Sequence, residues 1–274
     1  MLGVVLVGVG NALFHVGAGA HVLRRSAQRA AEGGVFVAPG ALGIFAGVWL
    51  GSHGVSCRAV VVGLLAAAFC VVLWSLPLER GDERSSPEPV ITDGRRGALP
   101  PLLLAAVCLL SSVVVRSVAG GAVNGAWRVI DPGLLVWLAV AAFAGKAAGG
   151  FAADRLGWAR TSAVALLVAA PLLSVWIGSA GAAVLGMLLL QSTMPVTLKA
   201  THLVLPSRPG LAFGLPCLAL LLGGLLGLAP LPALASAPGL FTGLLLSGAL
   251  IVAGLRLLEP TRAAGGEVQN APEA

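Results

Sequence analysis

The chain has 274 residues, of which 58% are hydrophobic and only 10% are charged, and its mean hydropathy is +0.97. Because soluble globular domains carry about 25% charged residues, this composition excludes an ordinary soluble protein and predicts an all-α, polytopic integral membrane protein. The formal net charge of +6 comes from short basic clusters between apolar runs. Such clusters set the orientation of a membrane protein, so no nucleic-acid partner is expected.

Apolar runs long enough to cross a bilayer, about 20 residues each, recur along the chain. Two of these runs are too long for one crossing. GSAG at 178–181 divides the first, and three prolines within 229–239 divide the second. The sequence therefore predicts about nine membrane spans, at 2–22, 33–52, 58–78, 98–121, 132–153, 160–178, 181–203, 209–229 and 236–257.

The basic residues predict the orientation of these spans. Arg24, Arg25 and Arg29 follow the first apolar run, whereas the basic residues of a signal peptide precede its apolar stretch. The positive-inside rule then places the N-terminus outside and the first loop inside. Every second loop along the chain contains basic residues in the same way. The only basic residues in the loops between them are Arg58 and Arg128. We expect a multi-pass protein of the plasma (inner) membrane with a cytoplasmic C-terminus.

One loop is much more polar than the others and divides the chain. LERGDERSSPEPVITDGRRGALP, residues 78–100, is charged and contains proline, which is typical of a linker. We predict a partial N-terminal bundle of three spans at 1–78, a cytoplasmic linker at 79–97, a six-helix bundle at 98–258 and a disordered cytoplasmic tail at 259–274.

Within the second span, Gly40, Gly43 and Gly47 share one helix face. Such a face lets another helix pack closely or slide, although glycines are also ordinary residues of membrane helices. Pro39 precedes them and favours a kink.

The stretch GGFAADRLGWAR, residues 149–160, ends the fifth predicted span. Its spacing resembles the cytoplasmic loop signature of the major facilitator superfamily, G-x-x-x-D-R-x-G-R-R. The matching residues are Gly150, Asp154, Arg155, Gly157 and Arg160. The sequence departs from the signature at Trp158 and Ala159, where the family usually has a basic residue.

The residue types in this motif suit a conformational latch. Glycines let two helices approach closely, and a carboxylate at a membrane boundary is stabilised by nearby arginines and by the positive N-terminal end of a neighbouring helix. The resemblance implies that Asp154 faces the start of the helix at 33–36. The alternative is a plain loop that obeys the positive-inside rule.

The resemblance also sets the register of the whole chain. Facilitators have two six-helix halves joined by a long cytoplasmic loop, and the signature follows the second helix of each half. Residues 98–257 then correspond to helices seven to twelve, and the first three spans to helices four to six. GNALFHVGAG, residues 10–19, is weakly similar to the fourth helix of fosmidomycin-resistance-type efflux proteins. Residues 191–215 resemble a passage from the tenth to the eleventh helix.

Polar residues inside the spans are candidates for a substrate or proton path, because a charge in the membrane is costly. For Arg116 the sequence leaves four interpretations open. The side chain binds an anionic substrate group, pairs with another helix, donates hydrogen bonds to backbone carbonyls, or snorkels to the membrane interface. His15 shares a helix face with Asn11 and either titrates for proton coupling or hydrogen-bonds a neighbour. The remaining candidates are Asn124, Gln191, Thr193 and Thr197.

We therefore expect a secondary transporter of a small molecule that works by alternating access, with proton coupling implied by the resemblance and the direction, efflux or uptake, left open. The alternative is a truncated or degenerate facilitator that acts as a non-transporting membrane protein or scaffold. A start upstream of Met1 is a third possibility. No enzyme motif, metal or cofactor is expected. The expected partners are the substrate, protons, the lipid bilayer, and an oligomer or partner that completes the N-terminal bundle.

Overall fold

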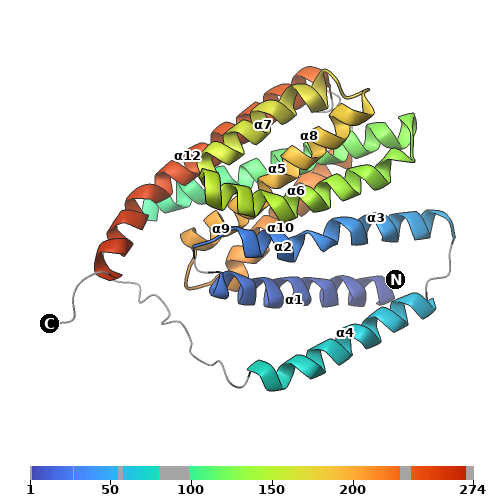
Figure 1. The fold of residues 1–274 in the computed structure, drawn as a ribbon, viewed down its shortest axis with the longest axis horizontal. Helices are drawn as coiled ribbons and strands as arrows, with labels where there is room; N and C mark the ends of the chain where they lie inside the picture. The colour runs from blue at the N-terminus through green and yellow to red at the C-terminus, as the bar shows by residue number, and fades with distance from the viewer. Residues whose placement is uncertain (1, 27, 55–57, 80–98, 229–235, 270–274) are drawn as a thin grey trace.

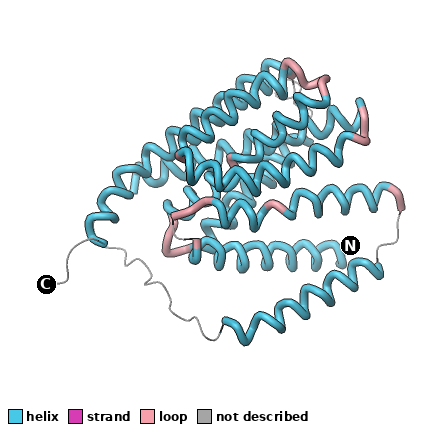
Figure 2. Tube along the Cα trace, in the orientation of Figure 1, coloured by secondary structure: helices cyan, strands magenta, loops and turns pink. Residues whose placement is uncertain are grey.

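Helices make up almost all of the computed structural model (Figure 1, Figure 2), which describes residues 2–26, 28–54, 58–79, 99–228 and 236–269. These residues contain no strand. In chain order the helices are α1 (Leu2–Arg25), α2 (Ala31–Val37), α3 (Pro39–Ser52), α4 (Arg58–Glu79), α5 (Leu99–Ile130), α6 (Leu134–Leu156), α7 (Trp158–Ser174), α8 (Ala180–Ser192), α9 (Met194–Val204), α10 (Pro209–Leu228) and α12 (Ala237–Gln269).

The helices lie at the positions of the predicted spans. Among the described residues, seven segments are long and apolar enough to cross a membrane. Two shorter apolar helices, Val61–Val71 and Trp158–Ser174, lie at the third and sixth predicted spans. The described part of the chain is thus helical and has the spans of a multi-pass membrane protein. The predicted linker lies almost entirely outside the described residues, since α4 ends at Glu79 and α5 begins at Leu99.

Two predicted spans are each formed by a pair of helices. Ala38 separates α2 from α3, and Pro39 occupies the first turn of α3, where its missing N–H costs nothing. Thr193 separates α8 from α9, and Pro195 lies in the first turn of α9. The break expected at Pro39 is therefore present.

Two helices are longer than predicted. The predicted span at 98–121 is part of α5, which continues to Ile130 because Val123 and Trp127 are buried in the core and stabilise its last turns. Helix α12 continues to Gln269, so residues 259–269 are helical rather than a disordered tail. Leu, Arg, Glu and Ala, which favour helices, are frequent where α12 leaves the apolar segment. Residues 270–274 lie outside the described residues.

The six predicted C-terminal spans form the main body of the structure. Helix α5 packs against both α10 and α12, and α6, α7 and α8 pack together, with α7 also against α12. Glycines bring α6 close to α8, because a Cβ on Gly145 or Gly149 would collide with the carbonyl oxygen of Leu188 or Ser192. The core between these helices is apolar and includes Leu109, Leu138, Leu166, Leu173, Met187, Leu190, Leu244 and Ile251.

The first three helices pack on this body along one side, with α1 against α10 and both α2 and α3 against α6. Leu23, Leu198, Ala212 and Phe213 form a small buried cluster between the two parts. Helix α4 lies at the margin of the structure (Figure 1), and its large apolar side chains, such as Leu65 and Trp74, are 65% and 75% exposed.

The predicted glycine face of α3 is not a close helix contact in this structure. A Cβ on Gly40, Gly43 or Gly47 would meet no atom within 4 Å. None of the α3 side chains is buried. In this structure Gly40, Gly43 and Gly47 are therefore ordinary glycines of a membrane helix rather than a face on which another helix packs closely.

Candidate functional site

Asp154 joins the two parts of the molecule. It lies in the last turn of α6, and its carboxylate accepts hydrogen bonds from the backbone N–H groups of Ala30, at 2.9 and 3.1 Å, and of Ala31, at 3.0 Å. These N–H groups belong to the start of α2 and have no partner within that helix. A carboxylate here is stabilised both by the hydrogen bonds and by the positive end of the helix. Asp154 therefore caps a helix that lies more than 120 residues away in the chain.

Glycine makes this approach possible from both helices. A Cβ on Gly150, one turn before Asp154, would lie 2.6 Å from the Ala31 Cα and 2.8 Å from the Ala30 oxygen. A Cβ on Gly34 would lie 2.5 Å from the backbone oxygen of Lys146. The start of α2 is correspondingly buried, with Ala30 and Ala31 each 1% exposed.

Gly157 and Trp158, at the junction of α6 and α7, also have structural roles. Gly157 has φ of +93°, a conformation that L side chains rarely adopt, and it ends α6 so that α7 begins at once. Trp158, which departs from the family signature, donates from Nε1 to the Asp154 carboxylate at 2.9 Å. The departure therefore supplies a further hydrogen bond to the carboxylate.

Two expectations for the motif need adjustment. Arg155 and Arg160 are exposed, and in the described part of the chain neither forms an ion pair with Asp154. Successive residues of a helix point about 100° apart, so Arg155 is directed away from α2 while Asp154 faces it. The cap expected near residues 33–36 is found instead at Ala30 and Ala31, because α2 begins two residues earlier than the predicted span.

Lys199 makes a second contact between the two parts, which the sequence analysis missed. It lies in α9 and is 2% exposed. Its Nζ donates to the carbonyl oxygen of Leu23 at 3.1 Å and to Oγ of Ser26 at 2.8 Å. The last carbonyls of a helix lack partners, and a cation is favourable there. Lys199 thus binds the C-terminal end of α1. A lysine inside the predicted span 181–203 was the available signal.

The two contacts hold the same turn, one at each of its ends. The cation of Lys199 lies at the negative end of α1, and the anion of Asp154 lies at the positive end of α2. Both come from the C-terminal part of the chain, and both hold the short turn that connects α1 to α2. We call this pair of contacts, together with Gly150 and Trp158, the α1–α2 clamp.

Arg116 lies elsewhere, inside the C-terminal part, and is only 6% exposed. Its guanidinium donates to Oγ1 of Thr193, to Oγ1 of Thr197 at 2.9 Å and, through Nε, to the carbonyl oxygen of Ser112 at 3.4 Å. The structure therefore brings three predicted site residues together where α8 gives way to α9. Among the described residues, no carboxylate contacts this guanidinium.

The other candidates do not join this group. Asn124 donates to the Gly120 oxygen of its own helix at 2.9 Å. Gln191 lies across from it on α8, since a Cβ on Gly120 would be 4.0 Å from Nε2 of Gln191. Asn124 on α5 and Gln191 on α8 lie near the Arg116 group. Among the described residues, neither forms a hydrogen bond with Arg116, Thr193 or Thr197.

Asn11 and His15 form a separate site on α1. Nδ1 of His15 is 3.0 Å from the backbone carbonyl oxygen of Asn11, one turn earlier, and the His15 ring lies beside Phe14 and Phe36, with centroid separations of 5.6 and 6.4 Å. Phe36 in turn contacts Phe213 of α10. The predicted path is thus divided in this structure between an aromatic group near His15 and the buried group at Arg116.

No protein-family model, curated protein or solved structure matches this chain.

Proposed function

We propose that the chain is a secondary transporter of a small molecule that works by alternating access. The observation that carries this proposal is the α1–α2 clamp, in which Asp154 and Lys199 hold the N-terminal helices by groups of opposite charge. The resemblance of residues 149–160 to the facilitator signature supports the same function. We further propose a facilitator-like layout with nine crossings, the N-terminus outside, and the clamp on the cytoplasmic side of the plasma membrane.

The distribution of contacts along α1 to α3 supports a gate at the clamp end. Leu23, Ala30 and Ala31 are each 1% exposed. Toward the other end of the same helices, a Cβ on Gly8 or Gly47 would meet nothing within 4 Å. Two bundles that are held together at the clamp end and packed less closely toward the other end are consistent with one state in an alternating-access cycle. We infer that this state is closed toward the cytoplasm.

The clamp is strong enough to set the balance between two such states. A hydrogen bond to a charged group contributes about 1.5–3 kcal/mol, and the minor conformation of a switching protein lies a few kcal/mol above the major one. Breaking one arm of the clamp is therefore sufficient to change which state predominates. A turn that only connected α1 to α2, without a role in switching, would not need buried contacts at the end of one helix and the start of the other.

Arg116 is the proposed contact for the substrate. Its positive charge is buried among neutral partners, Thr193, Thr197 and the Ser112 carbonyl. An ionised group in such a setting is costly unless an opposite charge compensates it. An anionic group on the substrate would provide this compensation. Coupling to protons is proposed from the resemblance alone, and His15 is the candidate proton carrier.

A non-transporting membrane protein or scaffold is the second candidate. The observation that favours it is α4, which lies at the margin of the structure (Figure 1) and has largely exposed apolar side chains. A second copy or another membrane protein would cover this helix in either case. Such a partner would complete the N-terminal bundle, so the exposure of α4 does not by itself separate the two functions.

Flux through reconstituted protein separates them. Wild type, Arg116→Ala, Arg116→Lys and empty vesicles would be compared for uptake of a broad panel of small anions, cations and neutral compounds, with and without a proton gradient. We expect flux of at least one anion in wild type that Arg116→Ala abolishes and Arg116→Lys partly retains. Equal flux in wild type and empty vesicles across the whole panel would favour the scaffold.

A further inference from the structure

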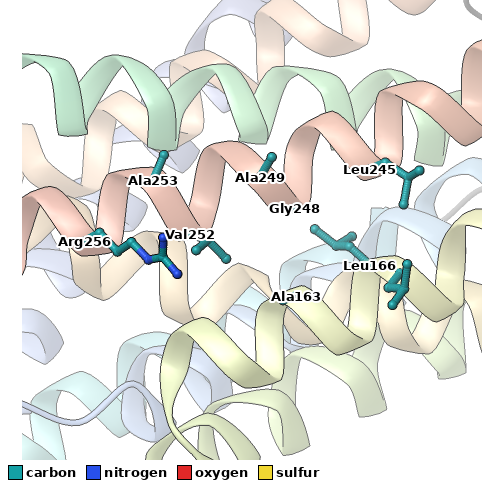
Figure 3. Close-up of a pocket in the computed structure, with 9 residues that line it drawn as sticks. Ala163, Leu166, Leu245, Gly248, Ala249, Val252, Ala253 and Arg256 are labelled. Carbon is teal, nitrogen blue, oxygen red and sulfur yellow. The ribbon is translucent and has the colours of Figure 1, made fainter.

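A groove lies between α7 and α12, on a face of the C-terminal part that the clamp and Arg116 do not use. It has a volume of about 450 Å³. Figure 3 shows Ala163 and Leu166 of α7 on one wall, Gly248 and Val252 of α12 on the other, and Arg256 at one end. Arg256 is the one residue with a polar side chain among those that line the groove.

A second arginine, Arg160, lies on α7 just before the residues of that helix that line the groove. Arg160 is one turn before Ala163 on α7, so both lie on one face of that helix. A Cβ on Gly248 would be 3.5 Å from the Leu166 Cβ, which fixes the level of one helix against the other. Arg160 is six residues before Leu166 on α7, and Arg256 is eight residues after Gly248 on α12. At the helical rise of ~1.5 Å per residue, these steps cover about 9 Å and about 12 Å along the two antiparallel helices. Arg160 and Arg256 are therefore nearly level.

Both arginines lie where the apolar segments stop. Arg160 is in the first turn of the apolar helix Trp158–Ser174, and Arg256 is in the last turn of the candidate span Ala237–Glu259. Both side chains are exposed. In the described part of the chain neither forms an ion pair, although Glu259 is one turn beyond Arg256.

We propose that this groove binds an anionic phospholipid, with an acyl chain along α7 and α12 and the phosphate between Arg160 and Arg256. The lining suits an acyl chain because it is apolar except for Arg256 at one end. The guanidinium groups suit a phosphate, to which arginine donates two parallel hydrogen bonds. Basic residues at the mouth of a groove between membrane helices are a known means of binding anionic head groups. The proposal depends on the membrane-spanning fold and not on transport.

Lipid retention measured by native mass spectrometry tests the site. The full chain would be reconstituted in vesicles of equal phosphatidylglycerol and phosphatidylcholine with identical acyl chains, then extracted in mild detergent. We expect wild type to retain phosphatidylglycerol preferentially. Replacing Arg160 and Arg256 by glutamine should lower this preference about fivefold for each arginine removed, because one such charge near an anionic lipid surface contributes about that factor.

Three further arms make the outcome specific. Arg128→Gln, an exposed arginine at the end of α5, should leave the preference unchanged. Ala249→Trp, which fills the groove, should reduce retention of both lipids while circular dichroism remains that of wild type. Glycerophosphoglycerol, the head group without acyl chains, should not displace the lipid. Equal retention of both lipids by wild type, an unchanged preference in the double variant, or displacement by the free head group would overturn the proposal.

Discussion

Lys199 and Ser26, 173 positions apart in the chain, are joined by a hydrogen bond of 2.8 Å from the ammonium Nζ to the serine Oγ. The same ammonium bonds the carbonyl oxygen of Leu23. This lysine is therefore a cross-link between α9 and the end of α1, and it is buried with its partners. Its position inside the contact between the two parts gives the first prediction.

Lys199→Met should open the α1–α2 clamp while it preserves the apolar stem of the side chain. A cysteine at position 23, where Leu23 is 1% exposed, would report the opening in a background without the four native cysteines. We expect a membrane-impermeant maleimide to label it roughly tenfold more in Lys199→Met, because a charged hydrogen bond contributes about 1.5–3 kcal/mol. Arg208→Gln, an exposed basic residue near the same end, is the matched control. Equal labelling in the two variants would mean that Lys199 does not hold the turn.

Asp154→Asn should weaken the other arm of the clamp. The amide keeps the shape of the side chain but loses the negative charge that favours the start of α2. It also keeps only one oxygen: Oδ2 of Asp154 accepts from the backbone N–H groups of both Ala30 and Ala31, whereas Oδ1 accepts from Trp158 Nε1 and from Ala30, and an amide cannot accept at both places. We expect a loss of about 1–3 kcal/mol, seen as a lower thermal unfolding temperature in detergent. Arg155→Gln should change this temperature little, since Arg155 is exposed and does not touch the carboxylate.

The two arms should behave as one unit. Asp154 and Lys199 hold the same turn, so removal of either releases it, and removal of the second adds less than its separate effect. Residues that share a structural element show coupling of about 0.5–3 kcal/mol. A double-mutant cycle of Asp154→Asn and Lys199→Met, measured by labelling at position 23, gives this coupling directly. Strict additivity would show two independent contacts.

The positions of the helices could be predicted because an apolar run of the right length has few alternatives in a membrane. Contacts between distant helices could not. Lys199 lies inside the predicted span at 181–203, but nothing local shows that α1 ends beside it. Arg116, Thr193 and Thr197 were predicted one by one, but their common site depends on the break between α8 and α9. His15 and Arg116 are both candidates for one path because both are polar residues inside predicted spans, whereas the structure gives His15 aromatic neighbours.

Gly150→Ala should separate α2 from α6. The added methyl would lie within 3 Å of the Ala31 Cα and the Ala30 oxygen, and backbone atoms move less readily than a flexible side chain. Overpacking of this kind costs about 1–3 kcal/mol. Gly125→Ala is the matched control, because a Cβ there meets nothing within 4 Å and alanine favours the helix by about 1 kcal/mol. We expect the unfolding temperature to fall in the first variant and to stay or rise in the second.

Thr197→Val should be more harmful than its small change in shape suggests. The substitution removes the oxygen that accepts from Arg116 at 2.9 Å and leaves a buried guanidinium donor without that partner. An unsatisfied buried donor costs about 1–3 kcal/mol, more when it is charged, whereas removal of both partners together costs less. Arg116→Met combined with Thr197→Val should therefore be more stable than the sum of the single losses predicts. Thermal unfolding of wild type, the two single variants and the double variant in one detergent gives the comparison.

The same variants test the proposed substrate contact. Because the substrate is proposed to bind the guanidinium of Arg116, a transported anion should protect wild type from unfolding and leave Arg116→Met unprotected. Protection of both proteins to the same extent would place the substrate elsewhere.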